Sequence, residues 1–367
     1  MRKIILIFLF FSIALDSSAQ TDSLKKVNPS FTKMLVGKEN IYALNSSGQL
    51  HVWDLKSLTR TFTSDTAVKY TSIAKDNSNK IYLGTAKGKI FTIDKNDYSI
   101  HLHLELKKDF SVTDIFFNSS DEIFLIVPYA VYDPIKDKNW TDFKHQPNGM
   151  IVSKRFLFFF RKRTNQYFDM PQYTFIDSQD RIWMTKSFGE FGGSIQIFDT
   201  QNRTELSADI DSLNFGLLFP KSVFEDKDQN VYITSGLQHF MNSGDIFKII
   251  NNTATKIYDS EDFSDTLETN PFGGGVFVGP GTYNPFDNKI YFATTDGFYR
   301  ATIPSEGRIE NPELIVKPEL LWDREPLAIG VSMSVKRLDF TEDNRLVFLT
   351  SNNGIGIYDG KELKMIK

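Results

Sequence analysis

The chain has 367 residues, of which 14% are aromatic, a formal net charge of −4 at pH 7 and no cysteine. The lack of cysteine excludes disulfides, thiolate metal sites and cysteine nucleophiles, and the mildly acidic charge argues against nucleic acid as a partner. A chain of this length can bury a core that is stable without disulfides. In an all-β protein, the many aromatic residues are first of all core material.

Residues 1–19 have the pattern of a cleavable secretory signal peptide. Residues 1–3 form a short basic segment with Arg2 and Lys3, residues 4–15 form an apolar run, and small residues lead up to Ala19. This order predicts cleavage after Ala19, followed by a short lead over residues 20–30. The alternative is an N-terminal membrane anchor, but about twelve apolar residues are fewer than the roughly 20 that cross a bilayer. We therefore expect a periplasmic or secreted protein without a stable membrane span.

One pattern recurs from residue 31 to residue 367. A turn rich in Asp and Asn precedes a short apolar strand, a turn with Thr, Ser or Gly follows, and the next strand often ends in Asp. The anchoring strands begin at Ile41, Ile81, Ile123, Ile182, Val231, Ile290 and Leu346. They are separated by 40 (81 − 41) to 59 (182 − 123) residues, and a period near this range with four short strands per unit is typical of a β-propeller. The sequence predicts one all-β propeller domain over residues 31–367, with about seven four-stranded blades and six or eight as alternatives.

The polar turns have a local explanation. Segments 76–80, 177–181, 226–230 and 284–288 are expected to join strand a to strand b of a blade, because Asn and Asp tolerate left-handed backbone conformations. A second set of acidic residues begins the expected turns between strands c and d, and its members are Asp54, Asp94, Asp133, Asp199 and Asp359. Five recurrent carboxylates could form a ligand ring, but turn formation accounts for all of them.

Residues 149–163 contain two expected strands outside the seven copies. Only 26 residues (182 − 156) separate Phe156 from Ile182, too few for a whole blade. We interpret this segment as an elaborated connection between blades three and four, with an eighth blade as the alternative. The ring is expected to begin with strand a near Phe31 and to end with strand d at residues 362–367, without strand exchange.

Two copies resemble a known repeat. Residues 76–85 (DNSNKIYLGT) and 177–185 (DSQDRIWMT) are similar to propeller repeats in the extracellular sensor regions of bacterial two-component regulators, and more distantly to WD-repeat propellers. That family usually places glycine just before the strand, where this chain has Asn79 and Asp180. The resemblance implies a propeller fold. It also implies a stand-alone sensing or binding unit, because the membrane span and kinase that follow such propellers in the family are not found here.

In an antiparallel blade, the b–c loops and the d–a connections between blades lie on one face. The longest insertions fall there, at residues 186–193, 236–243, 260–275 and 318–330, and long loops are commonly used for binding. Their large side chains are suited to stacking on sugars or peptides, and the candidates are Phe188, Phe191, His239, Phe240, Phe272 and Trp322. Each of them could instead pack beneath its own loop.

No motif for catalysis, metal binding or a cofactor is recognisable. His101 and His103 could chelate a metal, but a solvated strand face is the better interpretation. The nucleophile motif Gly-x-Ser-x-Gly is absent, and residues 273–275 (GGG) lead into a strand, where a phosphate cradle needs a helix. The basic residues 161–163 are expected to be a solvated rim, with an acidic ligand as the second interpretation.

The sequence therefore predicts an exported, non-catalytic propeller that holds a peptide, a glycan fragment or a protein partner on its b–c/d–a face. The alternative is a propeller-fold hydrolase or lyase that acts on a carbohydrate or lactone with carboxylates in the central channel. A purely structural or assembly role is a third possibility. Three or more acidic or His side chains at the channel mouth would favour the enzyme. An apolar rim would favour binding.

Overall fold

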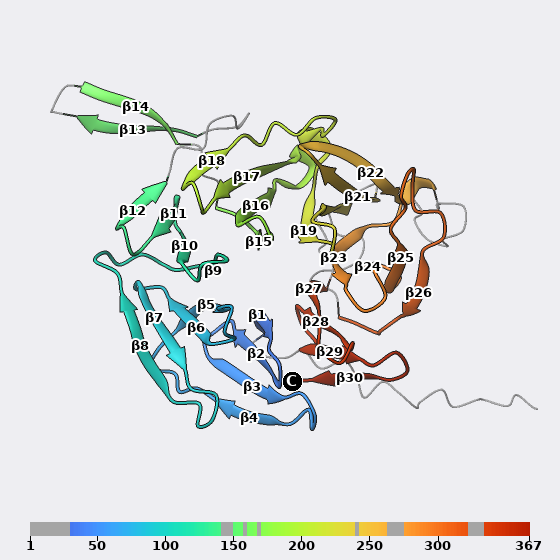
Figure 1. Ribbon diagram of the computed structural model, residues 1–367, viewed down its shortest axis with the longest axis horizontal. Helices are drawn as coiled ribbons and strands as arrows, with labels where there is room; N and C mark the ends of the chain where they lie inside the picture. The colour runs from blue at the N-terminus through green and yellow to red at the C-terminus, as the bar shows by residue number, and fades with distance from the viewer. Residues whose placement is uncertain are drawn as a thin grey trace, which may run out of the picture.

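The computed structural model describes residues 30–140, 150–156, 160–166, 170–238, 242–262, 275–321 and 334–367. Seven four-stranded antiparallel sheets form a ring of blades (Figure 1). In each blade the first strand lies nearest the centre of the ring and the fourth lies at its periphery. The predicted all-β propeller with seven blades is confirmed. Within the described residues, no helix is long and apolar enough to cross a membrane.

The strands follow one another in chain order within every blade. Blade 1 contains β1 (Phe31–Val36), β2 (Asn40–Asn45), β3 (Leu50–Asp54) and β4 (Arg60–Thr63). Blade 2 contains β5 (Tyr70–Lys75), β6 (Ile81–Thr85), β7 (Lys89–Ile93) and β8 (Ile100–Glu105). Blade 3 contains β9 (Asp114–Phe117), β10 (Ile123–Val127), β11 (Ala130–Asp133) and β12 (Lys138–Trp140). Blade 4 contains β15 (Tyr173–Ile176), β16 (Arg181–Ser187), β17 (Gly193–Asp199) and β18 (Thr204–Leu206).

The remaining three blades have the same order. Blade 5 contains β19 (Pro220–Glu225), β20 (Val231–Gln238), β21 (Asn242–Ile250) and β22 (Thr253–Asp259). Blade 6 contains β23 (Val278–Asn284), β24 (Lys289–Thr294), β25 (Phe298–Thr302) and β26 (Glu313–Val316). Blade 7 contains β27 (Val335–Phe340), β28 (Leu346–Thr350), β29 (Ile355–Tyr358) and β30 (Leu363–Ile366). Two short 3₁₀ turns, η1 (Gly189–Phe191) and η2 (Phe215–Leu217), flank β17 and β19.

The segment around residues 149–163, which left seven or eight blades open, forms a separate hairpin. Strands β13 (Met150–Phe156) and β14 (Phe160–Gln166) pair only with each other, between the fourth strand of blade 3 and the first strand of blade 4. Figure 1 shows this hairpin projecting from the outer edge of the ring. The interpretation as an elaborated d–a connection is therefore confirmed, and the eighth blade is excluded.

The ring closes without strand exchange, as predicted. Strand β1 opens blade 1 and β30 ends blade 7, and each sheet consists of consecutive strands. Side-chain packing joins the two ends, because Met34 and Trp53 of blade 1 lie in one buried cluster with Val347 and Ile357 of blade 7. The closing contact is thus made by apolar burial of the same kind that joins the other blades.

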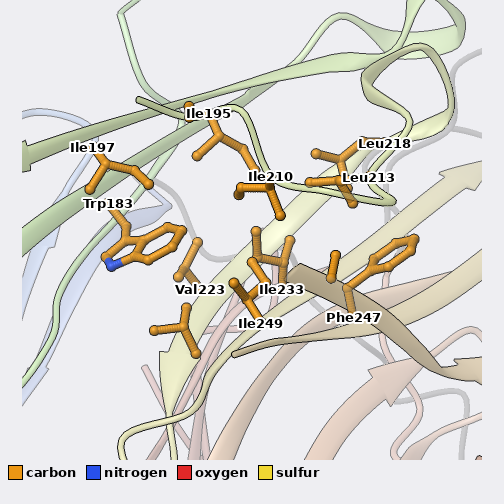
Figure 2. Close-up of a cluster of buried hydrophobic side chains, with 13 residues drawn as sticks. Trp183, Ile195, Ile197, Ile210, Leu213, Leu218, Val223, Ile233, Phe247 and Ile249 are labelled. Atoms are coloured by element: carbon orange, nitrogen blue, oxygen red, sulfur yellow. The ribbon is translucent and has the colours of Figure 1, made fainter. Parts of the chain in front are cut away.

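The core lies between neighbouring blades. Strands β6, β10 and β28 are buried at every residue, as expected for strands covered on both faces. Figure 2 shows one such interface, in which Trp183 and Ile197 of blade 4 pack toward Val223 and Ile233 of blade 5. Each of the seven interfaces between neighbouring blades has its own buried cluster of this kind.

The a–b turns have the predicted left-handed residues. Asn79 and Asp180 have φ values of 63° and 60°. In the turn of blade 4, Asp177 Oδ1 accepts the backbone N–H groups of Gln179 at 3.0 Å and Arg181 at 2.9 Å. Its Oδ2 accepts the indole N–H of Trp183 at 2.7 Å. The carboxylate thereby fixes both the turn and the buried tryptophan of strand b.

Asp180 also explains the missing glycine. Its Oδ1 accepts the Ser119 backbone N–H at 2.7 Å and its Oδ2 accepts the Ser119 hydroxyl at 2.6 Å, across the interface between blades 3 and 4. Glycine would accept the same backbone angle but would leave these donors without the carboxylate. The acidic residue therefore joins two blades at a position where the turn itself requires only a positive φ.

The acidic residues of the c–d turns are structural. Asp133 Oδ1 accepts the backbone N–H groups of Ile135 and Lys136, both at 2.9 Å. The same role is filled in other blades by Asp54, Asp94, Asp199 and Asp359. The interpretation of these five carboxylates as turn formers is confirmed.

Candidate binding face at the channel mouth

The b–c/d–a face is uneven, because the b–c hairpins of blades 4 and 5 are extended. In blades 2 and 7 the hairpin is a tight turn closed by a threonine. The Thr85 hydroxyl accepts the Lys89 N–H at 3.0 Å, and the Thr350 hydroxyl accepts the Asn353 N–H at 2.9 Å. In blade 5, pairing continues as far as Gln238 and Asn242. The predicted loop of blade 5 is therefore corrected, because residues 236–238 and 242–243 are strand residues of an extended hairpin. In blade 4 the last paired residues are Ser187 and Gly193, so the predicted loop is confirmed there.

Two exposed apolar side chains lie on neighbouring turns of this face, next to blades 4 and 5. Phe191 ends η1, Leu217 ends η2, and the two turns contact each other. Phe191 is 75% exposed and Leu217 is 64% exposed. Gly192 makes this contact possible, since a Cβ there would lie 2.2 Å from the Phe215 carbonyl oxygen. We call Phe191 and Leu217 the loop patch.

The predicted aromatic site residues have different outcomes. Phe191 belongs to the loop patch, whereas Phe188 is half-buried with the Lys186 ammonium 5.2 Å from the centre of its ring. The other four lie outside the described residues and stay predictions: His239, Phe240, Phe272 and Trp322. Sequence reasoning missed Leu217, because its neighbours Leu213 and Leu218 are core residues.

The first strands of several blades begin with a β-bulge. The register shifts between Phe31 and Lys33 in blade 1, between Pro220 and Ser222 in blade 5, and between Val335 and Arg337 in blade 7. A bulge bends its strand and changes the direction of a side chain. The first strands surround the ring centre (Figure 1). Each of those that follows a d–a connection begins on the b–c/d–a face, because that is where the connection ends. We call the beginnings of the seven first strands the channel mouth.

The channel mouth is cationic in an acidic protein. The first three residues of the seven first strands include four cations, Lys33, Lys221, Lys336 and Arg337, and one anion, Asp114. Their sum is +3 (4 − 1), against −4 for the whole chain. The last three residues of the same strands include one cation and two anions, Lys75, Glu225 and Asp339. Positive charge is therefore concentrated at the end of the channel that faces the long loops.

The one anion is already paired. Lys33 Nζ of β1 lies 2.5 Å from Asp114 Oδ1 of β9, so that an ion pair joins blades 1 and 3 past the intervening blade. Arg337 has a looser contact, 3.7 Å, with Asp339 on its own strand. Asp114 is therefore not a free carboxylate for catalysis at the channel mouth.

Lys221 has a different environment. Its side chain is half-buried, and its Nζ lies 5.5 Å from the centre of the Phe277 ring. No carboxylate of the described residues pairs with it. Burial lowers the pKa of Lys221 to about 8, because a partly apolar environment disfavours the charged form. At pH 7 the amine remains mostly protonated.

Tyr173 is the corresponding residue on the neighbouring first strand. It is the first residue of β15, which contacts β19, and it is half-buried. Burial raises the pKa of Tyr173 to about 12, so the hydroxyl stays protonated at neutral pH. This hydroxyl has no hydrogen-bond partner among the described side chains and backbone groups. Among the described residues, Lys221 and Tyr173 are thus two donors on adjacent blades for which no acceptor is found, and we call them the donor pair.

Buried carboxylates lie elsewhere. Burial raises the pKa of Asp245 on the third strand of blade 5, where Lys256 Nζ lies 2.9 Å from its Oδ1. Burial also raises the pKa of Asp296 in the b–c turn of blade 6. Over the described residues, no three His, Cys, Asp or Glu side chains are grouped as metal ligands would be. Neither Asp245 nor Asp296 belongs to a first strand. Burial also raises the pKa of Glu225, the last residue of β19, whose carboxylate accepts the backbone N–H and the hydroxyl of Ser178, both at 2.9 Å.

Comparison with known proteins supports the fold. No family model matches the chain, and no curated protein matches its sequence. Hydrazine synthase of Kuenenia stuttgartiensis is similar in structure, with a TM-score of 0.56 and 9% identity over 95% of this chain and 98% of that chain. U3-55K has a TM-score of 0.52 and 9% identity over 89% of this chain and 90% of its own. At such low identity these similarities show the propeller fold alone.

Proposed function

We propose that this protein is an exported, non-catalytic propeller that binds a partner through its b–c/d–a face. The loop patch is the observation that carries this proposal. Phe191 and Leu217 are held outward by two adjoining 3₁₀ turns. Large apolar side chains presented together on a fixed backbone are typical of interaction surfaces.

The channel mouth supports binding better than catalysis. A hydrolase or lyase of the kind considered above would require carboxylates in the channel, as glycoside cleavage commonly does. The beginnings of the first strands supply Asp114 alone, and Lys33 neutralises it. Three described carboxyl groups have raised pKa values, and none begins a first strand. Asp245 is on the third strand of blade 5, Asp296 is in a b–c turn of the same face, and Glu225 ends β19 at the opposite end of the channel.

Export is part of the same proposal. The signal-peptide pattern of residues 1–19 predicts that the mature chain begins at Gln20 in the periplasm or the medium. Intact-mass measurement of the protein from the periplasmic and extracellular fractions tests it. A mass that retains residues 1–19 would contradict cleavage, and recovery from the cytoplasm would contradict export.

Capture of partners by matched variants tests the binding face. Immobilised wild-type protein, the double variant Phe191→Ser/Leu217→Ser and the control Phe286→Ser are incubated with an envelope fraction. Phe286 is 51% exposed in an a–b turn, on the opposite face. We expect a partner that wild type and control retain at micromolar concentration and that the double variant loses. Equal retention by all three proteins, or no retained partner, would contradict the proposal.

A further inference from the structure

We propose that the hairpin of β13 and β14 is a second binding element, which attaches the protein to the surface of a membrane that contains anionic phospholipids. The inference concerns a different part of the chain from the loop patch and does not depend on the proposed function. The hairpin projects from the outer edge of the ring (Figure 1), and within the described residues neither strand pairs with a blade. Seven residues in each strand extend about 24 Å, so its end can reach a surface at some distance from the ring.

The hairpin is basic in an acidic protein. Residues 150–166 contain no anion and five cations, Lys154, Arg155, Arg161, Lys162 and Arg163. Their sum is +5, so the rest of the chain carries −9 (−4 − 5). An anionic surface attracts the hairpin and repels the remainder of the protein, which confines contact to this element.

The strand register places like charges opposite each other. Lys154 pairs with Lys162, and Arg155 pairs with Arg161. Like charges that are directly opposite destabilise an antiparallel pair, and an isolated two-stranded hairpin is only marginally stable in water. No residue of the hairpin is acidic, so nothing within it offsets this repulsion. An external anionic partner would offset it and thereby stabilise the hairpin.

The order of residues along the hairpin favours a lipid surface. Phe156 and Phe160 form the last pair before the chain reverses, and the two pairs of cations follow directly behind them. At a membrane, aromatic residues lie at the boundary of the acyl chains and cations lie at the headgroups. Lys154 and Phe156 are two residues apart, which is about 7 Å along a strand. This spacing matches the depth of about 5 to 10 Å to which apolar groups enter the interface.

The cations occupy both faces of the hairpin. Residues alternate between the two faces along a strand, so the pair of Lys154 and Lys162 lies on one face. The pair of Arg155 and Arg161 lies on the other face. The cation positions thus form a band behind the aromatic end. A hairpin that enters a surface end-on meets headgroups around the whole band, whereas a protein or a nucleic acid laid against one face contacts half of it.

The free strand edges are not suited to a second copy of this chain. Each strand of the hairpin has one outer edge that no described strand pairs. Edge-to-edge pairing of two hairpins would place ten cations (5 + 5) in one sheet. Charged residues on edge strands normally prevent such association. The charge of the hairpin is therefore complementary to an anionic surface and not to itself.

Vesicle sedimentation tests the inference. The probes are vesicles of equimolar phosphatidylglycerol and phosphatidylcholine, vesicles of phosphatidylcholine alone, and the soluble polyanion heparin. The variant Arg161→Gln/Lys162→Gln removes one cation from each like-charged pair, and Phe156→Ser/Phe160→Ser removes the aromatic pair. All proteins are full chains with the same N-terminus, so that any binding by residues 1–19 cancels in the comparison.

A matched control removes the same charge elsewhere. Lys87→Gln/Lys95→Gln replaces two exposed cations in turns of blade 2. Thermal unfolding of every variant shows whether the propeller still folds, since the hairpin pairs with no blade. Hydrogen exchange over residues 150–166, with and without vesicles, locates the contact.

We expect wild type and the control to bind the anionic vesicles about a hundredfold or more tightly than phosphatidylcholine alone. Arg161→Gln/Lys162→Gln should lose about thirtyfold in affinity for the anionic vesicles, which is about 2 kcal/mol, or about 1 kcal/mol for each cation. Phe156→Ser/Phe160→Ser should lose about tenfold on vesicles and nothing on heparin, which contacts the cations alone. Hydrogen exchange over residues 150–166 should become slower on anionic vesicles.

Several results would overturn the inference. Equal binding of the two kinds of vesicle, binding of neither, or equal losses by Arg161→Gln/Lys162→Gln and the control would each do so. An unchanged vesicle affinity of Phe156→Ser/Phe160→Ser would also contradict it. Unchanged hydrogen exchange over residues 150–166 in vesicle-bound protein would assign the contact to another part of the chain. Binding of heparin without binding of anionic vesicles would replace the membrane by a soluble polyanion.

Discussion

Replacing Lys221 by methionine should make the protein more stable at neutral pH. Burial moves the pKa of Lys221 from its ordinary value of 10.5 to about 8. At about 1.4 kcal/mol per pKa unit, a shift of this size corresponds to a destabilisation of about 3 kcal/mol when the amine is charged. The side chain keeps some contact with water, which screens the effect. We therefore expect Lys221→Met to raise the free energy of unfolding at pH 7 by about 1 to 2 kcal/mol, since methionine fills a similar volume without charge.

The pH dependence of this gain has a definite sign. Between pH 8 and pH 10.5 the unfolded chain keeps the Lys221 proton while the folded chain has lost it. The unfolded state then binds more protons, so this residue makes wild-type stability rise with pH across that window. The advantage of Lys221→Met should be largest below pH 8 and should disappear near pH 10.5. Tyr173 on β15 stays neutral through most of this range, because burial raises its pKa to about 12.

Urea denaturation at pH 7 and pH 10, followed by tryptophan fluorescence, measures both effects. Only the difference between variant and wild type is used, so that other groups titrating at pH 10 cancel. Lys336→Met is the matched control, because Lys336 is an exposed cation at the same end of the channel; its effect should stay within about 0.5 kcal/mol. A Lys221→Met variant that is less stable than wild type at pH 7, or whose gain is the same at both pH values, would refute the reasoning.

Two further predictions concern contacts between blades. Asp180→Gly should lower the free energy of unfolding by about 2 to 3 kcal/mol, because it removes the acceptor of two Ser119 donors. Asn79→Gly is the control at the same turn position, with φ 63°, and should change the free energy of unfolding by less than about 1 kcal/mol. Equal losses for the two variants in urea denaturation would mean that the contact between blades contributes little. For the Lys33–Asp114 ion pair, a double-mutant cycle with Lys33→Met and Asp114→Leu should give a coupling of about 1 kcal/mol, and a coupling near zero would show that the pair does not stabilise the channel mouth.

The propeller could be predicted because its structural elements are local. A strand such as Ile81–Thr85 is buried on both faces, so its sequence is continuously apolar or small. The turn before it needs one left-handed residue, and Asn79 supplies it. The residues within each copy of the repeat therefore determine the four strands of that blade. The number of blades depends on how the hairpin of β13 and β14 is interpreted. Only 26 residues separate Phe156 from Ile182, where the next anchoring strand begins, and a whole blade needs more.

The donor pair could not be predicted in the same way. Nothing near Lys221 in the sequence distinguishes it from a solvated surface lysine. Its position follows from the bulge between Pro220 and Ser222, and a shift of one residue in a strand moves a side chain to the other face. The surroundings of the Tyr173 hydroxyl depend on residues of other blades. The sequence did point to Phe191 as a loop side chain, but its exposure follows from the contact between η1 and η2.

The seven copies within the chain also indicate which positions are available for function. The residue that begins the a–b turn accepts backbone N–H groups in blade after blade, at Asp76, Asn118, Asp177 and Asp226. Four copies in one chain share this chemistry because the turn needs it. By contrast, the first strands begin with the more varied triplets FTK, YTS, DIF, YTF, PKS, VGP and VKR, among which an aromatic residue followed by Thr occurs three times. The fold tolerates lysine, serine, aspartate, tyrosine and proline there, so it does not dictate which residues occur. The fold therefore does not set the charge at these positions, which leaves them available for function.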